Sequence, residues 1–407
     1  EEKFWEPLDI KKATNEAYVT AQTYKTHFKV TTFMHNSIFA NNENILISPS
    51  TIDSSSDKIE YTYGVIIPKG QTSSIQKTGG YTVSLNHSNT LTAAEKVIKE
   101  ALNKGYDQLL QEQIDAWAKV WEMSDITIEG DVKAQQGIRF NIFQLNQTYS
   151  GKDNRLNIGP KGFTGEKYGG STYWDTEAYC IPFYMATKDQ QVARNLLTYR
   201  YNQLDKAIEN AQNNLGFKDG AALYPMVTMN GEECHNEWEI THEEIHRNGA
   251  IAFAIFNYIR YTGDYSYLPE KGLEVLIAIA RFWHQRASFS TDKNQYVILG
   301  VTGPNEYENN INNNFYTNYV AKWCIDYAAE QITKVAAENP LDHKRIIEKV
   351  KLTENEIKEW KKVANGMYFP FSTALNVYLQ LDGFFVNVLV MVKDLDSSQR
   401  PIHHNWS

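Results

Sequence analysis

Two glutamates lie close together in the segment Val301-Thr-Gly-Pro-Asn-Glu-Tyr-Glu-Asn-Asn310, between two stretches with helical periodicity. Gly303-Pro304 cannot continue a helix, because proline lacks the backbone N–H and glycine adds backbone entropy. The pattern therefore predicts a loop that presents Glu306 and Glu308 between rigid elements, where catalytic groups commonly lie. Taken alone, however, the segment favours a surface loop with two solvated glutamates.

A second candidate is the acidic stretch 231–240, which holds four carboxylates, a histidine and a tryptophan within ten residues. Trp238, flanked by Glu237 and Glu239 and preceded by His235, offers an apolar platform edged with hydrogen-bond acceptors, which suits a polyhydroxyl ligand. Carboxylates so clustered are unfavourable without a ligand or a counter-charge. The structural alternative is that they stabilise a helix dipole, by about 0.3–1 kcal/mol each.

Trp174 and Asp175 open a predicted helix and pair a stacking face with a bidentate acceptor for hydroxyl groups. The alternative interpretation is a buried tryptophan beside an aspartate that caps the helix. The preceding loop, residues 161–170, is rich in glycine and lysine. It matches neither Gly-x-x-x-x-Gly-Lys-Ser/Thr nor Gly-x-Gly-x-x-Gly, so no nucleotide site is predicted.

His242-Glu-Glu-Ile-His246 matches the zinc-protease pattern His-Glu-x-x-His. We discount it, because His242 falls in the first turn of a predicted helix and no third ligand follows at the required spacing. No metal site is therefore expected.

The composition excludes several classes of function. A net charge of -9 over 407 residues, without a basic block, argues against nucleic acid and anionic membrane surfaces. No run approaches the ~18 apolar residues that a membrane span requires. Three scattered cysteines, without Cys-x-x-Cys, suit a reducing cytoplasm. The 25 Tyr, 18 Phe and 9 Trp residues would suit stacking on sugar rings, although most will be core.

The hydrophobic period divides the chain into three parts. Residues 1–90 alternate with period 2, which predicts part of an antiparallel β-sandwich. Residues 91–129 form a helical linker that begins with a capping box at Thr92-Ala-Ala-Glu95 and is broken near Gly105. The rest, 130–407, is mainly helical, with further capping boxes at Thr241 and Thr353. Helices are predicted over 137–150, 175–187, 190–213, 242–262, 272–288, 315–338 and 354–368.

Several long motifs resemble one enzyme family, the inverting disaccharide phosphorylases of glycoside hydrolase family 65. They are Arg155–Gly170, Thr172–Glu177, Glu233–Thr241, Glu244–Ala250 and Val301–Asn310. The resemblance extends through essentially the whole chain and is densest from 137 to 325. The form Cys-His-Asn-Glu-Trp-Glu of the acidic stretch resembles the maltose-acting members more than those acting on trehalose or kojibiose.

The resemblance implies a mainly α fold: a β-sandwich, a helical linker, an (α/α)6 barrel and a C-terminal β domain, usually as a homodimer. It implies phosphorolysis of an α-linked glucose disaccharide to β-glucose 1-phosphate and glucose. Inorganic phosphate is then the co-substrate and no cofactor is needed. Both ends of that architecture have no counterpart here, so we expect a fragment holding the N-terminal part of the barrel.

The resemblance also implies roles for the residues of this chain that match the family's motifs. Glu306 matches the general acid, and Trp174 and Asp175 match residues that bind the transferred glucosyl unit. The 232–240 stretch, with His235, Glu237, Trp238 and Glu239, matches the segment that shapes the acceptor side. One departure is Asn305, where the family commonly has aspartate.

The chemistry makes a demand on Glu306. An inverting glycosidase needs an acid and a base carboxylate, whereas phosphate is already an anionic nucleophile, so only the acid is required. That acid must hold its proton near neutral pH, through desolvation or a neighbouring carboxylate, and Glu308 could contribute. An inverting α-glucosidase on the same scaffold and a catalytically silent carbohydrate-binding fragment remain as alternatives.

Overall fold

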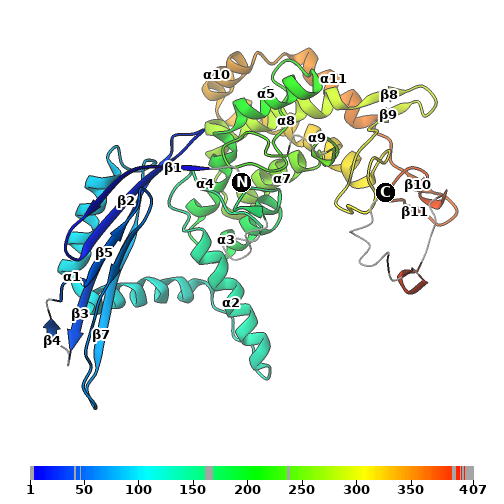
Figure 1. Cartoon of the computed structure of the whole chain (residues 1–407). Helices are drawn as coiled ribbons and strands as arrows, with labels where there is room; N and C mark the ends of the chain where they lie inside the picture. The colour runs from blue at the N-terminus through cyan, green and yellow to red at the C-terminus, as the bar shows by residue number, and fades with distance from the viewer. Residues whose placement is uncertain are drawn as a thin grey trace. The chain divides into compact units, whose positions relative to one another are not determined.

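The computed structural model describes residues 4–40, 43–45, 47–160, 168–235, 239–386, 391–394, 396 and 398 (Figure 1). The chain divides into two compact units, Glu1–Lys119 and Val120–Ser407. The first is built on an antiparallel sheet and the second is mainly helical. In the part of the chain that is described, no helix is both long and apolar enough to cross a membrane.

The N-terminal unit is built on a five-stranded antiparallel sheet in the order β1-β2-β3-β4, with β7 also paired to β3. Its strands are β1 (Trp5–Lys12), β2 (Glu16–Thr23), β3 (Lys29–Ala40), β4 (Glu43–Ile45) and β7 (Ser73–Val83). A separate ribbon joins β5 (Thr51–Ser54) to β6 (Ile59–Thr62). All of these strands lie within residues 1–90, where the alternation of period 2 predicts an antiparallel β structure.

Helix α1 (Thr90–Ser124) begins in this unit and supplies part of its core. Ala94 and Ile98 pack with Tyr18 and Phe33 of the sheet. The break predicted at Gly105 is present, with φ 75° and ψ 171°. The predicted capping box is wrong, because Asn89 rather than Thr92 accepts the hydrogen bond at the helix start.

The C-terminal unit consists of helices joined by long loops and short ribbons. The helices are α2 (Val132–Thr148), η2 (Thr176–Cys180), α3 (Ile181–Thr187), α4 (Gln190–Tyr201), α5 (Leu204–Leu215), α6 (Ile240–Glu243), α7 (Arg247–Thr262), η3 (Leu268–Gly272), α8 (Leu273–Arg286), α9 (Phe315–Glu338), α10 (Pro340–Val350) and α11 (Glu354–Asn365), followed by the short turns η4 (Phe384–Val386) and η5 (Val392–Asp394). The ribbons are β8 (Ser288–Ser290) with β9 (Gln295–Val297), and β10 (Phe371–Ser372) with β11 (Val377–Tyr378).

Helix α8 lies at the centre of the core of this unit, since every residue from Leu273 to Trp283 is buried. It packs against α7, α9 and α11. Helices α7 and α9 approach closely at Gly249, where a Cβ would lie 2.3 Å from a methyl group of Val320. These packed helices are the rigid frame from which the loops of the candidate site extend.

Candidate functional site

The segment 301–311, here called the Glu306 loop, is a loop as the sequence predicts. It follows the β8–β9 ribbon, which was not predicted, and leads into α9. Its ends are joined by two backbone hydrogen bonds between Val301 and Ile311, of 2.9 and 2.8 Å. Inside the loop, Asn305 makes a turn, because its carbonyl oxygen accepts from the amide of Glu308 at 3.2 Å. Glu306 is exposed and Glu308 is half-buried.

Glu243, at the end of α6, holds this loop in place. Its Oε2 accepts hydrogen bonds from the hydroxyl of Thr302 at 2.6 Å and from the amide of Asn310 at 2.9 Å. Its carbonyl oxygen also accepts from the amide of Thr302 at 3.2 Å. The loop that carries Glu306 is thus fixed at both ends to the segment before α7.

The predicted continuous helix over 242–262 is wrong. Helix α6 stops at Glu243, Glu244 takes φ −77° and ψ 53°, and α7 starts only at Arg247. Thr241 does not cap the helix, since its hydroxyl donates to the carbonyl oxygen of His235 at 2.6 Å. The two histidines of the zinc-like pattern therefore do not share one helix. Among the described residues, no group of three or more His, Cys, Asp or Glu could hold a metal ion.

The break turns Glu244 and His246 into the protein, where they are 4% and 1% exposed. The carboxyl groups of Glu244 and Glu306 lie within hydrogen-bonding reach of each other. Burial raises the pKa of Glu244 to about 8, with further contributions from the charge of Glu306 and, more weakly, of Asp175. Two carboxyl groups in contact, one of them buried, can hold a proton at neutral pH.

Arg247, the first residue of α7, brings a positive charge to the same place but does not neutralise the pair directly. Its guanidinium donates to the carbonyl oxygens of Tyr224, Thr241 and Glu244 at 2.5, 2.7 and 3.0 Å. Burial lowers the pKa of Arg247 to about 10, and its charge lowers that of Glu244 only in part. The guanidinium mainly fixes the backbone around the helix break.

Trp174 and Asp175 lie beside this group. The ring of Trp174 contacts the ring of His246 edge-on, with centroids 5.0 Å apart at 88°. Burial and the charge of Arg247 lower the pKa of His246 to about 3, so the imidazole is neutral. Asp175 makes no side-chain capping hydrogen bond at the start of η2, so the interpretation as a helix cap is wrong.

A buried ion pair positions the Trp174–Asp175 segment. Arg200 of α4 bonds both carboxylate oxygens of Glu177 at 2.6 and 3.0 Å, and their side chains are 3% and 0% exposed. The same guanidinium donates to the carbonyl oxygen of Tyr173 at 3.3 Å. The half-buried aromatic–acid pair is therefore held by the core rather than by its own loop.

The acidic stretch is only partly described. Glu237 and Trp238 lie outside the described residues, and His235 and Glu239 are exposed. Glu239 lines a surface pocket with His242. The role of His235 and Glu239 on the acceptor side stays a prediction.

One carboxylate of that stretch turns inward and has a structural role. Glu233 accepts hydrogen bonds from the amides of Met226 at 2.6 Å and Val227 at 3.1 Å. Its side chain is 2% exposed and lies 3.9 Å from the guanidinium of Arg247. At this position the clustered charge is compensated by the protein itself.

Four residues of this site were not predicted from the sequence to have a role in it: Glu243, Glu244, His246 and Arg247. The available signal was the motif Glu244–Ala250, which was among those carrying the resemblance. These residues were not assigned to the site because a continuous helix was expected over 242–262. On such a helix their side chains would not converge on the Glu306 loop.

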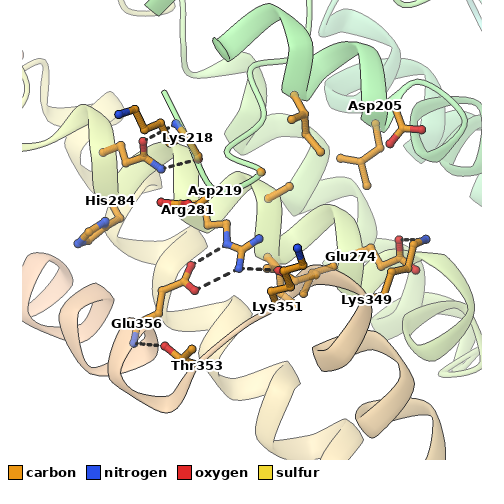
Figure 2. Close-up of a pocket in the computed structure, with 17 residues that line it drawn as sticks. Asp205, Lys218, Asp219, Glu274, Arg281, His284, Lys349, Lys351, Thr353 and Glu356 are labelled. Atoms are coloured by element: carbon orange, nitrogen blue, oxygen red, sulfur yellow. Dashed lines mark hydrogen bonds and ion pairs between the residues drawn. The ribbon is translucent and has the colours of Figure 1, made fainter. Parts of the chain in front are cut away.

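A separate pocket of about 850 Å³ lies between α5, α8, α10 and α11 and contains none of the predicted site residues. Figure 2 shows two of its carboxylates, those of Glu356 and Glu274, bonded to cations. Arg281 bonds both oxygens of Glu356 at 2.6 and 3.1 Å, and Lys349 bonds Glu274 at 2.6 Å. These closed ion pairs are typical of a structural role rather than of acid–base chemistry.

Comparison with known proteins bears on what the carboxyl pair is for. The profile of the glycosyl hydrolase family 65 central catalytic domain matches residues 139–407, and that of the family's N-terminal domain matches residues 1–120. The chain belongs to glycosyl hydrolase family 65. Both profiles agree with the resemblance that the motifs carry.

The relatives of this family 65 chain include named phosphorylases. Maltose phosphorylase of Bacillus subtilis (strain 168) is 51% identical over 317 residues, 78% of this chain and 41% of that protein. Alpha,alpha-trehalose phosphorylase of Thermoanaerobacter brockii is 35% identical, over 89% of this chain and 47% of that protein. The solved structure of a putative kojibiose phosphorylase from human microbiome has a TM-score of 0.86 and 27% identity, covering 99% of this chain and 52% of that one. The chain thus spans about half the length of these relatives.

Proposed function

We propose that the protein carrying this chain catalyses inverting phosphorolysis of an α-linked glucose disaccharide, with maltose as the favoured substrate, to β-glucose 1-phosphate and glucose. The observation that carries the proposal is the contact between the carboxyl groups of Glu306 and buried Glu244, beside Trp174 and Asp175. The higher identity to a maltose phosphorylase than to a trehalose phosphorylase supports maltose.

In this proposal Glu306 is the general acid. It protonates the glycosidic oxygen while the bond from that oxygen to C1 breaks, and an oxygen of inorganic phosphate forms the new bond to C1 from the opposite face. Phosphate supplies its own negative charge, so no base carboxylate is needed. No cofactor takes part.

Trp174 and Asp175 would bind the transferred glucosyl unit, the ring by stacking and the carboxylate by accepting hydroxyl hydrogen bonds. His235, Glu237, Trp238 and Glu239 would shape the side that receives the second glucose. The burial of the segment around Glu177 supports the first assignment, because a fixed pair loses little entropy on binding sugar.

For the architecture, we propose that the helices of the C-terminal unit are part of an (α/α)6 barrel. The proposed parts are a partial β-sandwich over 1–90, a helical linker over 91–129 and the N-terminal part of the barrel over 130–407. The structural likeness to a putative kojibiose phosphorylase at TM-score 0.86 supports this arrangement. We also propose that the full-length protein is a cytoplasmic homodimer.

The test incubates the full-length protein carrying this chain with maltose, trehalose, kojibiose or nigerose, each with and without inorganic phosphate. We expect β-glucose 1-phosphate from maltose only when phosphate is present. Glucose release at the same rate in water alone would contradict phosphorolysis and favour an inverting α-glucosidase. Sugar binding without either product would favour a catalytically silent binding protein.

A further inference from the structure

A buried carboxyl group in contact with the proposed acid is the least expected feature of the site. Glu244 is 4% exposed, and carboxylates are almost never buried to this degree unless a cation pairs with them. Here the contacting group is the carboxyl of Glu306, which can hydrogen-bond to Glu244 only if one of the two carries a proton.

The charged groups around Glu244 come from three separate segments. Glu306 comes from the Glu306 loop, Asp175 from the start of η2 and Arg247 from α7. His246 adds no charge near neutral pH, because its pKa is lowered to about 3. Glu244 therefore has two other carboxyl groups and one guanidinium around it, and that guanidinium also has buried Glu233 at 3.9 Å and donates its hydrogen bonds to backbone carbonyl oxygens. This surplus of negative charge favours a retained proton.

We propose that Glu244 and Glu306 share one proton, and that Glu244 is a positioning residue that keeps the catalytic carboxyl supplied with it. The inference rests on the proposed function, since it gives Glu306 the proton that phosphorolysis requires. In this proposal Glu244 is the neighbouring carboxyl group that helps Glu306 to keep its proton. From the sequence, only Glu308 was suggested for this role.

The proton balance closes without another reactant. Glu306 gives the shared proton to the glycosidic oxygen as the C1–O bond breaks, which leaves the pair with two negative charges. An oxygen of HPO₄²⁻ forms the bond to C1. The remaining phosphate proton then returns to the pair, because the sugar phosphate leaves as a dianion. No net proton is released and nothing is oxidised or reduced.

Difference infrared spectroscopy tests the shared proton without reference to turnover. The protonated-carboxyl band is followed with pH in the wild-type full-length protein and in the variants Glu244→Gln and Glu306→Gln. We expect the titration midpoint of the last protonated carboxyl to fall by about one pH unit or more in each variant, since either change removes the repulsion between two carboxylates.

The matched control is Glu348→Gln, because Glu348 is an exposed glutamate of α10 whose carboxylate lies 3.9 Å from the ammonium of Lys344. It should keep the wild-type midpoint, and thermal melting shows whether each variant is folded. A midpoint that is the same in wild type and Glu306→Gln would overturn the shared proton, whether or not the enzyme turns over.

The kinetic arm measures kcat/KM for phosphorolysis against pH, which reports groups of the free enzyme. In Glu244→Gln the alkaline midpoint of kcat/KM should fall by about one unit or more, while Glu348→Gln keeps the wild-type midpoint. An unmoved midpoint in Glu244→Gln would overturn the catalytic role of the pair. Infrared shifts in a protein without phosphate-dependent turnover would instead reject the proposed function and leave the shared proton standing.

Discussion

Two glutamates of the C-terminal unit are equally buried, with 4% of each exposed, yet they have opposite partners. Glu274, in the pocket between α5, α8, α10 and α11, bonds the ammonium of Lys349 at 2.6 Å. Glu244 bonds another carboxyl group, that of Glu306. The first arrangement pairs the buried charge with a cation through one carboxylate oxygen, whereas the second leaves the charge unfavourable and retains a proton.

The difference separates two uses of the same residue type. Carboxylates paired with cations, such as Glu356 with Arg281, link elements that are distant in sequence. Carboxyl groups paired with each other destabilise the ionised protein and are concentrated at functional sites. The pocket between α5, α8, α10 and α11 is therefore the weaker candidate for an active site. The carboxyl groups of Glu244 and Glu306, beside Trp174, are the stronger candidate.

The largest expected effect follows from removing the acid itself. Glu306→Gln should lower the rate of maltose phosphorolysis by about 10²–10⁴-fold, because no carboxyl is left to protonate the glycosidic oxygen. Sugar affinity should be retained, since Trp174 and Asp175 are unchanged. Assays of glucose 1-phosphate release and calorimetric sugar titration check both. A rate near that of the wild type would remove Glu306 from the mechanism.

Removing an ion pair from the pocket between α5, α8, α10 and α11 should lower the stability of the fold and leave catalysis unchanged. Arg281→Ala leaves the carboxylate of Glu356 without its cation in a pair whose side chains are 6% and 22% exposed. The free energy of unfolding should fall by about 3 kcal/mol, with the rate per folded molecule unchanged. Denaturant titration measures the first quantity.

The control for this change is Lys344→Ala, which removes the cation of an exposed pair with Glu348, 74% and 68% exposed. It should change stability by no more than about 0.5 kcal/mol. A large loss of turnover per folded molecule in Arg281→Ala would show that the two regions are not separate in function.

The pH dependence of stability sharpens the comparison further. The pKa of Glu244 is raised from 4.5 to about 8 on folding, so its stabilising contribution is complete below about pH 4.5 and is lost as pH rises through about 8. Glu244→Gln removes this loss. Its stability relative to the wild type should therefore increase from about pH 5 to about pH 8, with a slope no steeper than about 1.4 kcal/mol per pH unit. A pH-independent difference between the two would contradict the raised pKa.

The smallest effect is expected for Glu308, the carboxylate that the sequence suggested as the neighbour that helps Glu306 to keep its proton. Glu308→Gln should change kcat/KM by less than about twofold and leave the alkaline midpoint in place, because the structure gives the tuning contact to Glu244. A shift of that midpoint as large as the one expected for Glu244→Gln would return the role to Glu308.

Features set by local chemistry were predictable from the sequence. Gly303-Pro304 indicated the Glu306 loop, and the break at Gly105 followed from one residue type. Thr353 caps α11 as predicted, accepting from the amide of Glu356 at 3.2 Å. The carboxylate of Glu356 instead reaches Arg281, 75 residues away, which no local pattern could indicate.

Features set by tertiary contacts were missed. No glycine or proline marks the end of α6 at Glu243, and Thr241 with Glu244 resembles a capping box. The break is fixed by Arg247, which binds the carbonyl oxygens of Thr241 and Glu244 just before it and that of Tyr224, 23 residues away. A buried glutamate against another glutamate contradicts the general preference for exposed or paired carboxylates, so the sequence alone favoured solvation.

The most direct test of Glu306 as the acid compares two substrates in Glu306→Gln. Maltose needs a proton on its leaving oxygen, whereas α-glucosyl fluoride releases fluoride without one. With phosphate present, the full-length variant should lose about 10²-fold or more on maltose but less than about tenfold on the fluoride. Equal losses on both substrates would contradict the account, because they would mean that Glu306 supports binding or folding and not proton transfer.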